Sequence, residues 1–187
     1  RRMAEFDKLQ KLAKDQGARG ANLGHVLARN RGAKAKLRLK RTPESVEFKV
    51  TEVGQNEIRR VPLHRDALSG MEYFFSVFPL EYVHHDDRIN PRSIGANIRG
   101  LVEEFLKKRP QLHVGLAWWA PEEDGAGRVR IFDGQHKAAA QILLGVRELP
   151  LRVFIEPDTN VLLVTNTNAG DKLRQVAFDT AVMRHLG

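Results

Sequence analysis

Residues 131–140, Ile-Phe-Asp-Gly-Gln-His-Lys-Ala-Ala-Ala, join a strand pattern directly to a helix pattern. Just before this stretch, apolar residues and arginines alternate over 128–131, which is typical of a strand. Just after it, residues 138–144 are rich in alanine and leucine and stop at Gly145, which predicts a helix and its end. The sequence therefore predicts a strand, a tight turn and a helix in direct succession.

The turn carries the first candidate site. Gly134 can adopt the left-handed backbone that a tight turn requires, and the free N–H groups of the helix's first turn then point beyond the strand end. A helix end favours an anion by only about 0.3–1 kcal/mol. Gln135, His136 and Lys137 would supply the remaining hydrogen bonds and charge, which predicts a phosphate site. The alternative is an ordinary connection with Asp133 as N-cap, which leaves the succession Gln-His-Lys unexplained.

The segments around the turn complete a mixed α/β pattern. Strands are predicted over 112–119 and 148–155, and the aromatic-rich segment 73–83 reads as an edge strand because Pro79 interrupts it. A helix is predicted over 96–107, because apolar residues recur there at helical spacing. Its expected apolar face consists of Ile98, Leu101, Val102, Phe105 and Leu106.

The order of these elements, together with the turn, resembles the N-terminal domain of the ParB and sulfiredoxin superfamily, in the branch that carries a DGQHR motif. Residues 89–93, Ile-Asn-Pro-Arg-Ser, are similar to the "NPR" segment of that superfamily, and residues 166–168, Asn-Thr-Asn, lie where relatives carry a nucleotide-contacting asparagine box. The resemblance covers residues 73–180. It departs at Lys137, where the motif has arginine, and lysine keeps the charge but loses the bidentate fork.

The resemblance implies an α/β (α+β) fold in which helices flank a small mixed sheet, and a nucleotide-binding, NTP-hydrolysing domain. ATP with Mg²⁺ is the expected cofactor pair, and DNA the expected partner in a DNA-modification or defence system, with a possible homo-oligomer. A non-enzymatic DNA-binding transcriptional regulator of the same fold is the alternative. Direct DNA cleavage is disfavoured, because the sequence shows no clear carboxylate pair for two metal ions.

The expected roles follow from a Mg²⁺-nucleotide at the turn. Asp133 is the candidate metal ligand, and Asp133 and His136 are the candidate catalytic residues. Ser93 is also expected to cap the helix that follows it. The residues expected to bind nucleotide are Arg92, Ser93, Asn97, Gly134, Gln135, Lys137 and Asn168.

The amino-acid composition limits the possible chemistry and cellular compartment of the protein. The 187 residues contain no cysteine, which excludes disulfides, thiolate metal sites and the cysteine chemistry of sulfiredoxins and favours a reducing cytoplasm. The sequence contains no long apolar run, so no membrane span is predicted. Because the chain begins at Arg1 and not at methionine, we expect it to be a portion of a larger protein.

The net charge of +8 is concentrated at the start of the chain. Residues 1–41 contain thirteen Lys and Arg against three acids, which leaves 18 basic and 20 acidic residues of the totals of 31 and 23 for the remainder. Such a basic segment is typical of polyanion binders. The residues expected to contact the DNA backbone, on one face of a strand, are Lys34, Lys36, Arg38, Lys40 and Arg41.

The sequence therefore divides into a basic N-terminal segment, 1–72, and a ParB-like nucleotide-binding domain, 73–187. Within the first, a helix is predicted over 2–16 and a second, short helix from Asn22. A hairpin is predicted in which residues 34–40 pair with 46–51. The stripe expected on the first helix is Met3, Phe6, Leu9 and Leu12.

Three further clusters have competing interpretations. Residues 84–87, His-His-Asp-Asp, favour a solvated loop over a metal site, because neighbouring side chains of a strand point in opposite directions. Glu103 and Glu104 favour an exposed helix face over catalysis. Trp118 and Trp119 are adjacent, so one is expected to face the core and the other the opposite surface, and core packing is favoured over base stacking.

Overall fold

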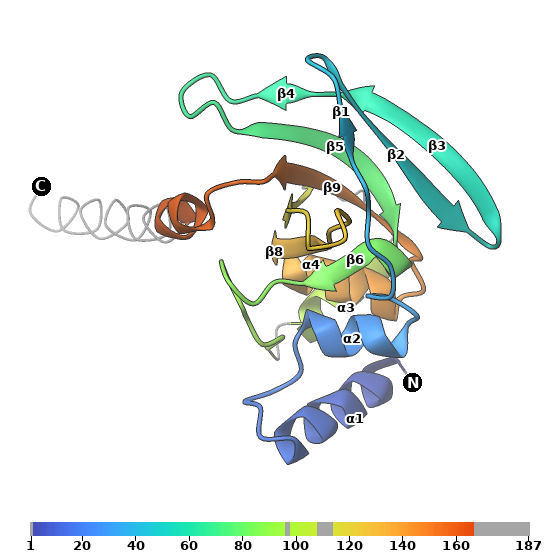
Figure 1. Ribbon diagram of the computed structural model, residues 1–187. Helices are drawn as coiled ribbons and strands as arrows, with labels where there is room; N and C mark the ends of the chain where they lie inside the picture. Colours follow the sequence, from blue (N-terminus) through green and yellow to red (C-terminus); the bar gives the residue numbers. More distant parts are fainter. Residues whose placement is uncertain (1, 96–97, 108–113, 167–187) are drawn as a thin grey trace, which may run out of the picture. The chain divides into compact units, whose positions relative to one another are not determined.

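The computed structural model describes residues 2–95, 98–107 and 114–166 (Figure 1). The chain divides into two compact units, Arg1–Pro157 and Asp158–Gly187. In the second unit, residues 159–166 are helical. The predicted division into residues 1–72 and 73–187 rests on charge and resemblance, and it stays a prediction. No helix in the described residues is long and apolar enough to cross a membrane.

A six-stranded mixed sheet forms the centre of the first unit, with the strand order β4-β5-β9-β7-β8-β6. β9 pairs antiparallel with β5 and parallel with β7, and β6 pairs parallel with β8. This mixed sheet with helices confirms the expected α/β fold class. The strands are β4 (His64–Arg65), β5 (Glu72–Pro79), β6 (Val83–His85), β7 (Gly115–Trp119), β8 (Val129–Asp133) and β9 (Glu148–Ile155); a 3-10 helix, η1 (Leu80–Tyr82), separates β5 from β6.

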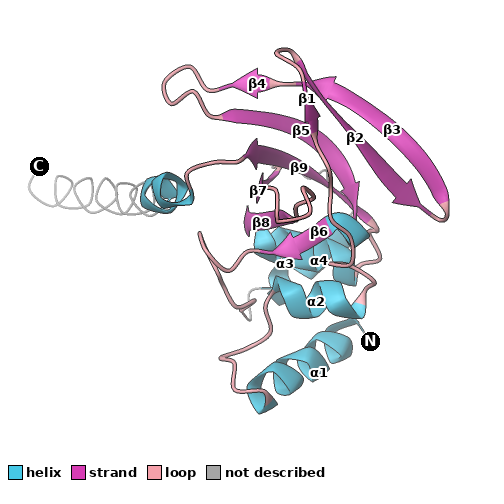
Figure 2. Ribbon diagram, in the orientation of Figure 1, coloured by secondary structure: helices cyan, strands magenta, loops and turns pink. Residues whose placement is uncertain are grey.

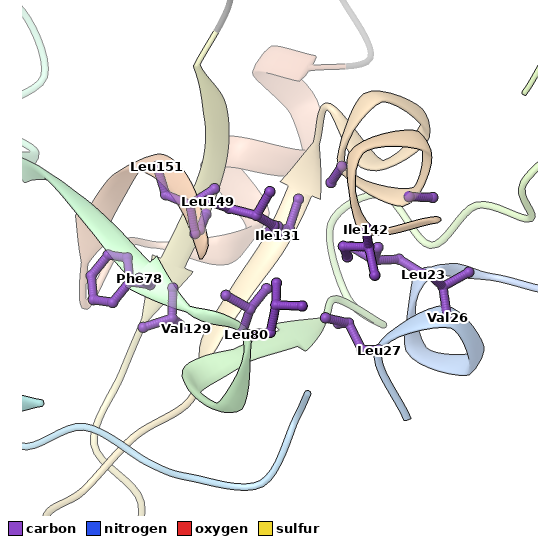
Figure 3. Packing of buried hydrophobic residues seen from close by; sticks show 14 of the residues in the cluster. Leu23, Val26, Leu27, Phe78, Leu80, Val129, Ile131, Ile142, Leu149 and Leu151 are labelled. Carbon is purple, nitrogen blue, oxygen red and sulfur yellow. The ribbon is translucent and has the colours of Figure 1, made fainter. Parts of the chain in front are cut away.

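Helices α2 (Leu23–Arg29), α3 (Ile98–Leu106) and α4 (Gln135–Leu143) pack together beside this sheet, and α1 (Arg2–Asp15) packs against α2 (Figure 2). Leu23 and Leu27 of α2 and Ile142 of α4 meet Ile131 and Leu149 of the sheet in one apolar core (Figure 3). This core fixes the start of α4 relative to the ends of β8 and β9.

Helix α1 forms where it was predicted, but its buried stripe differs by one position. Phe6, Leu9 and Ala13 are buried, whereas Leu12 is 44% exposed. A spacing of three and then four residues keeps these side chains on one face, and Leu12 lies off it. Gly17, at φ +89°, ends the helix in a left-handed conformation.

The predicted pairing of residues 34–40 with 46–51 is wrong. Residues 34–39 are extended, and only β1 (Lys40–Arg41) pairs with β2 (Ser45–Glu52), through two residues. The full-length partner of β2 is β3 (Gln55–Pro62), which the sequence pattern did not reveal. The turn between them, Val53-Gly54, has positive φ at both residues, as the tightest hairpin turns require.

The prediction for the two tryptophans is also wrong in part, because both side chains are buried. Trp118 is 2% and Trp119 4% exposed. The Trp118 Nε1 donates to Asp86 at 2.9 Å, and the Trp119 Nε1 donates to the Leu37 carbonyl at 2.8 Å. Other parts of the protein therefore cover both faces of β7 at its C-terminal end.

Candidate functional site

The turn between β8 and α4 has the geometry expected of an anion site. Gly134 is the N-cap of α4 at φ +83°, and no side chain caps this end. The amide of Ala138 donates to the Gly134 carbonyl at 3.0 Å. The three preceding amides, of residues 135–137, therefore lie ahead of the first intrahelical bond. Asp133 belongs to β8 and is not the N-cap, so this part of the alternative interpretation is wrong.

A pocket of about 460 Å³ opens at this turn, within the size range of small-ligand sites. Its lining combines polar and apolar side chains, and we call these two sets the polar wall and the apolar wall. The polar wall consists of Arg92, Asp133, His136, Lys137 and Gln141, and the apolar wall of Leu101, Val114, Leu116, Leu149, Pro150 and Leu151.

Gln135 lies at the base of the pocket but does not offer its amide nitrogen to a ligand. Its side chain is 2% exposed, and the Nε2 donates to the carbonyls of Asn90 at 2.8 Å and Phe132 at 2.9 Å. The expected role of this side chain as a phosphate donor is therefore corrected. Gln135 instead fastens the 86–95 loop to the turn.

Asp86 holds the other end of that loop, a role that was not predicted for it. The carboxylate is fully buried and accepts four hydrogen bonds. One comes from Trp118, and the others come from the amides of Arg88, Ile89 and Asn90, at 3.1, 2.9 and 2.7 Å. The loop expected to be solvated is thus anchored inside the fold, and the described residues contain no cluster that could hold a metal ion.

Arg92 lines the pocket from the 86–95 loop, and His136 lines it from the first turn of α4. The Arg92 side chain is exposed, and its Nε donates to the Asn90 Oδ1 at 3.0 Å. The Nε2 of His136 accepts from the Gly95 amide at 3.5 Å. Burial, and then the charge of Arg92, lower the pKa of His136. The imidazole is therefore neutral at pH 7, which suits an acceptor at this nitrogen.

Asp133 and Lys137 also line the pocket, Asp133 exposed and Lys137 half-buried. Mg²⁺ is commonly held by one or two carboxylates together with nucleotide phosphates and water, so a single carboxylate fits this ion. Asp133 would hold it, and the ion would neutralise phosphate charge.

Ser93 is not among the described residues that line the pocket. It pairs with Asn22 in an isolated bridge. Its expected role as a helix cap stays a prediction, because residues 96 and 97 lie outside the described residues. Asn97 and Asn168 lie outside the described residues. Glu103 is exposed, as expected of an outward helix face.

The row of cations before β1 is exposed, as its alternation predicted, but acids neutralise part of it. Lys36 pairs with Asp124 at 3.0 Å. Arg41 pairs with Glu72 at 3.2 Å and with Glu156 at 2.5 Å. Within the described part of the chain, no ion pair forms at three of the five: Lys34, Arg38 and Lys40.

No protein-family model and no curated protein matches the chain. Among solved structures, it is similar to the C-terminally truncated chromosome-partitioning protein ParB from Caulobacter crescentus, complexed with CTP-gamma-S. The identity is 18% and the TM-score 0.39, over 50% of this chain and 53% of that one. The likeness thus spans about half of that ParB, and at this TM-score it does not assign the chain to a family.

Proposed function

We propose that the pocket binds a nucleoside triphosphate, with its phosphates at the Gly134 turn. One observation carries this proposal: the uncapped start of α4 opens into a pocket that also presents Arg92 and Lys137. Amide donors and cations on one wall are the groups that bind phosphate oxygens in proteins.

The charge balance of the polar wall supports an anionic ligand. Arg92 and Lys137 contribute two positive charges, Asp133 contributes one negative charge, and His136 is neutral because its pKa is lowered. Lys137 acts as a point charge and orients a phosphate less strictly than an arginine would. A Mg²⁺ ion held by Asp133 would offset the remaining charge of a triphosphate.

The apolar wall supports a ligand with an apolar part. Leu116 and Pro150 lie there with other aliphatic residues, and such a surface can cover a ribose or the face of a base. Aliphatic side chains do not read the edges of a base, so this wall does not select among nucleotides. ATP remains the expected nucleotide from the sequence resemblance.

We further propose that the bound nucleotide is hydrolysed. Phosphoryl transfer needs positioning and charge neutralisation more than covalent chemistry from the protein. The acceptor nitrogen of neutral His136 is Nε2, which would have to release the Gly95 amide to accept a proton from an attacking water. Asp133 is the carboxylate for the ion. If so, Asp133→Asn should abolish phosphate release while nucleotide still binds.

A nucleotide titration followed by thermal unfolding tests the proposal. A ligand that binds only the folded protein raises its melting temperature. ATP, GTP and CTP are each added with Mg²⁺ to the wild type, to Lys137→Ala and to a control, Lys49→Ala, whose exposed lysine lies on β2. We expect the Lys137→Ala affinity to fall about 10-fold or more, since charge-assisted hydrogen bonds contribute about 1.5–3 kcal/mol. No stabilisation by any nucleotide, or equal stabilisation of all three proteins, would contradict the proposal.

DNA is the proposed partner, and a DNA-binding regulator is the second candidate function. Lys34, Arg38 and Lys40 favour both, because these exposed cations remain unpaired among the described residues. Changing all three to alanine should weaken duplex binding and flatten its salt dependence. Unchanged binding would remove this surface from the account. DNA affinity that is independent of nucleotide, without turnover, would favour the regulator over the NTPase of a modification or defence system.

A further inference from the structure

Strand β5 turns aromatic side chains away from the helices. Phe74 and Phe78 lie in the apolar core, whereas Tyr73, Phe75 and Val77 alternate with them and lie on the other face of the sheet. Phe75 is 47% and Val77 39% exposed. Adjacent exposed apolar side chains often mark an interaction site, so this face is a candidate binding surface.

The rings on this face come from the paired strands β4 and β5, which lie side by side in Figure 1. His64 stacks on Tyr73, with centroids 5.4 Å apart and planes inclined by 18°. Phe75 meets both rings edge-on, with centroids 5.6 Å from His64 and 5.9 Å from Tyr73. We call these three residues, together with Arg152, the aromatic–arginine face.

Arg152 of β9 lies opposite Phe75 in the strand register. Its guanidinium carbon is 4.0 Å from the Tyr73 centroid and 4.8 Å from that of Phe154, a close cation–π arrangement. Its buried Nε has no hydrogen-bond partner, and within the described residues Arg152 forms no ion pair. Rings contact the cation, and its interaction with the Asp66 carboxylate is weak: after the Ser69 hydrogen bonds, the Arg152 charge contributes to the lowered pKa of Asp66.

We propose that the aromatic–arginine face binds single-stranded nucleic acid. Exposed bases would stack on Phe75 and on the His64–Tyr73 pair, and Arg152 would attract the backbone phosphates. Stacking on aromatic side chains beside a cation is how many proteins hold single strands. A duplex hides its base faces, and an apolar protein partner would bury Arg152 without an acceptor, at a high desolvation cost.

This inference is independent of the nucleotide pocket. Neither His64, Tyr73, Phe75 nor Arg152 lines that pocket. It also differs from the DNA contact proposed for residues 34–40, since a row of cations attracts duplex backbones whereas rings need unpaired bases.

Fluorescence anisotropy with a labelled oligothymidylate of about 15 nucleotides, and with the matching duplex, tests the proposal. We expect Phe75→Ala to weaken single-strand binding by about 5- to 100-fold, because one stacked base contributes that much. Phe75→Trp should keep the affinity. Leu68→Ala is the control, because Leu68 is aliphatic, 99% exposed and located in the loop between β4 and β5.

Three results would overturn the proposal. The first is an affinity of Phe75→Ala within two-fold of the wild type, and the second is an equal loss in Leu68→Ala, which would indicate general apolar adhesion. The third is self-association that Phe75→Ala abolishes without any change in oligonucleotide binding, which would make this face a contact between two copies. Thermal stabilisation by nucleotide should be the same in Phe75→Ala and the wild type, so failure here is separate from failure at the pocket.

Discussion

Asp86 positions a site that it does not line. Its carboxylate accepts three amide hydrogen bonds that shape the turn from Arg88 to Asn90, and Trp118 donates the fourth. Asn90 then contacts the turn through its own side chain, whose Nδ2 donates to the Phe132 carbonyl at 3.0 Å. The Arg92 Nε donates to the Oδ1 of the same asparagine. The position of Arg92 in the pocket thus depends on the buried carboxylate of Asp86, six residues earlier.

The substitution Asp86→Asn should destabilise the protein by about 3 kcal/mol, because an amide places donors where buried amides already donate. The control is Asp87→Asn, since the adjacent carboxylate is exposed. Urea unfolding of the wild type and both variants measures the difference. Equal stability of the two variants would show that the Asp86 hydrogen bonds contribute little.

Single residues also show where sequence reasoning stops. Gly134 could be predicted, because a strand that passes directly into a helix needs a left-handed residue at the junction. The bond from Gln135 to Asn90 and the bond from Trp118 to Asp86 could not, because they span 45 and 32 residues and no local pattern encodes them. The other three bonds of Asp86 are local, from the amides of residues 88–90.

At the scale of elements, the passage from β8 into α4 is the most tightly defined part of the site. The Gly134 backbone is left-handed, and a Cβ atom there would lie 3.3 Å from the Gly115 Cα of β7. The turn is therefore held against the neighbouring strand. This close approach keeps the first amides of α4 at the mouth of the pocket.

The substitution Gly134→Ala should cost more stability than Gly17→Ala. Both glycines have φ near +85°, at +83° and +89°, so each change carries a left-handed penalty of about 1–2 kcal/mol. Only Gly134 adds the close contact, because nothing lies within 4 Å of a Cβ at Gly17. The melting temperatures of both variants test this. A Gly17→Ala loss equal to or larger than the Gly134→Ala loss would contradict the close packing of the turn.

The element that was missed, β3, is one whose sequence is only weakly patterned. β9 and α1 carry strong periodicity, and both lie where the sequence placed them. β3 does not, because most of its side chains are exposed on both faces, so no alternation of apolar and polar residues marks it. Its register comes from the Val53-Gly54 turn and from pairing with β2.

At the scale of the whole molecule, three histidines make stability depend on pH. Burial is the main cause that lowers the pKa of His84, His85 and His136. The charges of Arg128 and Arg130 lower that of His84 further. The unfolded chain, with histidine pKa values of about 6.5, therefore binds protons that the folded protein does not.

Stability should accordingly be complete above pH 6.5 and fall as the pH drops below it. Urea unfolding at pH 7.5 and 5.5 measures this loss. His84→Gln keeps a donor for the Ala35 carbonyl, which the His84 Nε2 contacts at 2.8 Å, and it should reduce the loss. His64→Gln, at an exposed histidine, is the control. A pH dependence that is the same in all three proteins would refute the role of His84.

The central claim is that the amides which follow Gly134 bind a phosphate. The most direct measurement is the set of backbone amide resonances of Gln135, His136 and Lys137 in an NMR titration with Mg²⁺-ATP and, separately, with inorganic phosphate. Hydrogen bonds to an anion move amide protons downfield, so we predict saturable downfield shifts at these three residues and none at the start of α2, which Asn22 already caps. Shifts that are absent from residues 135–137, or spread equally over both helix starts, would contradict the account.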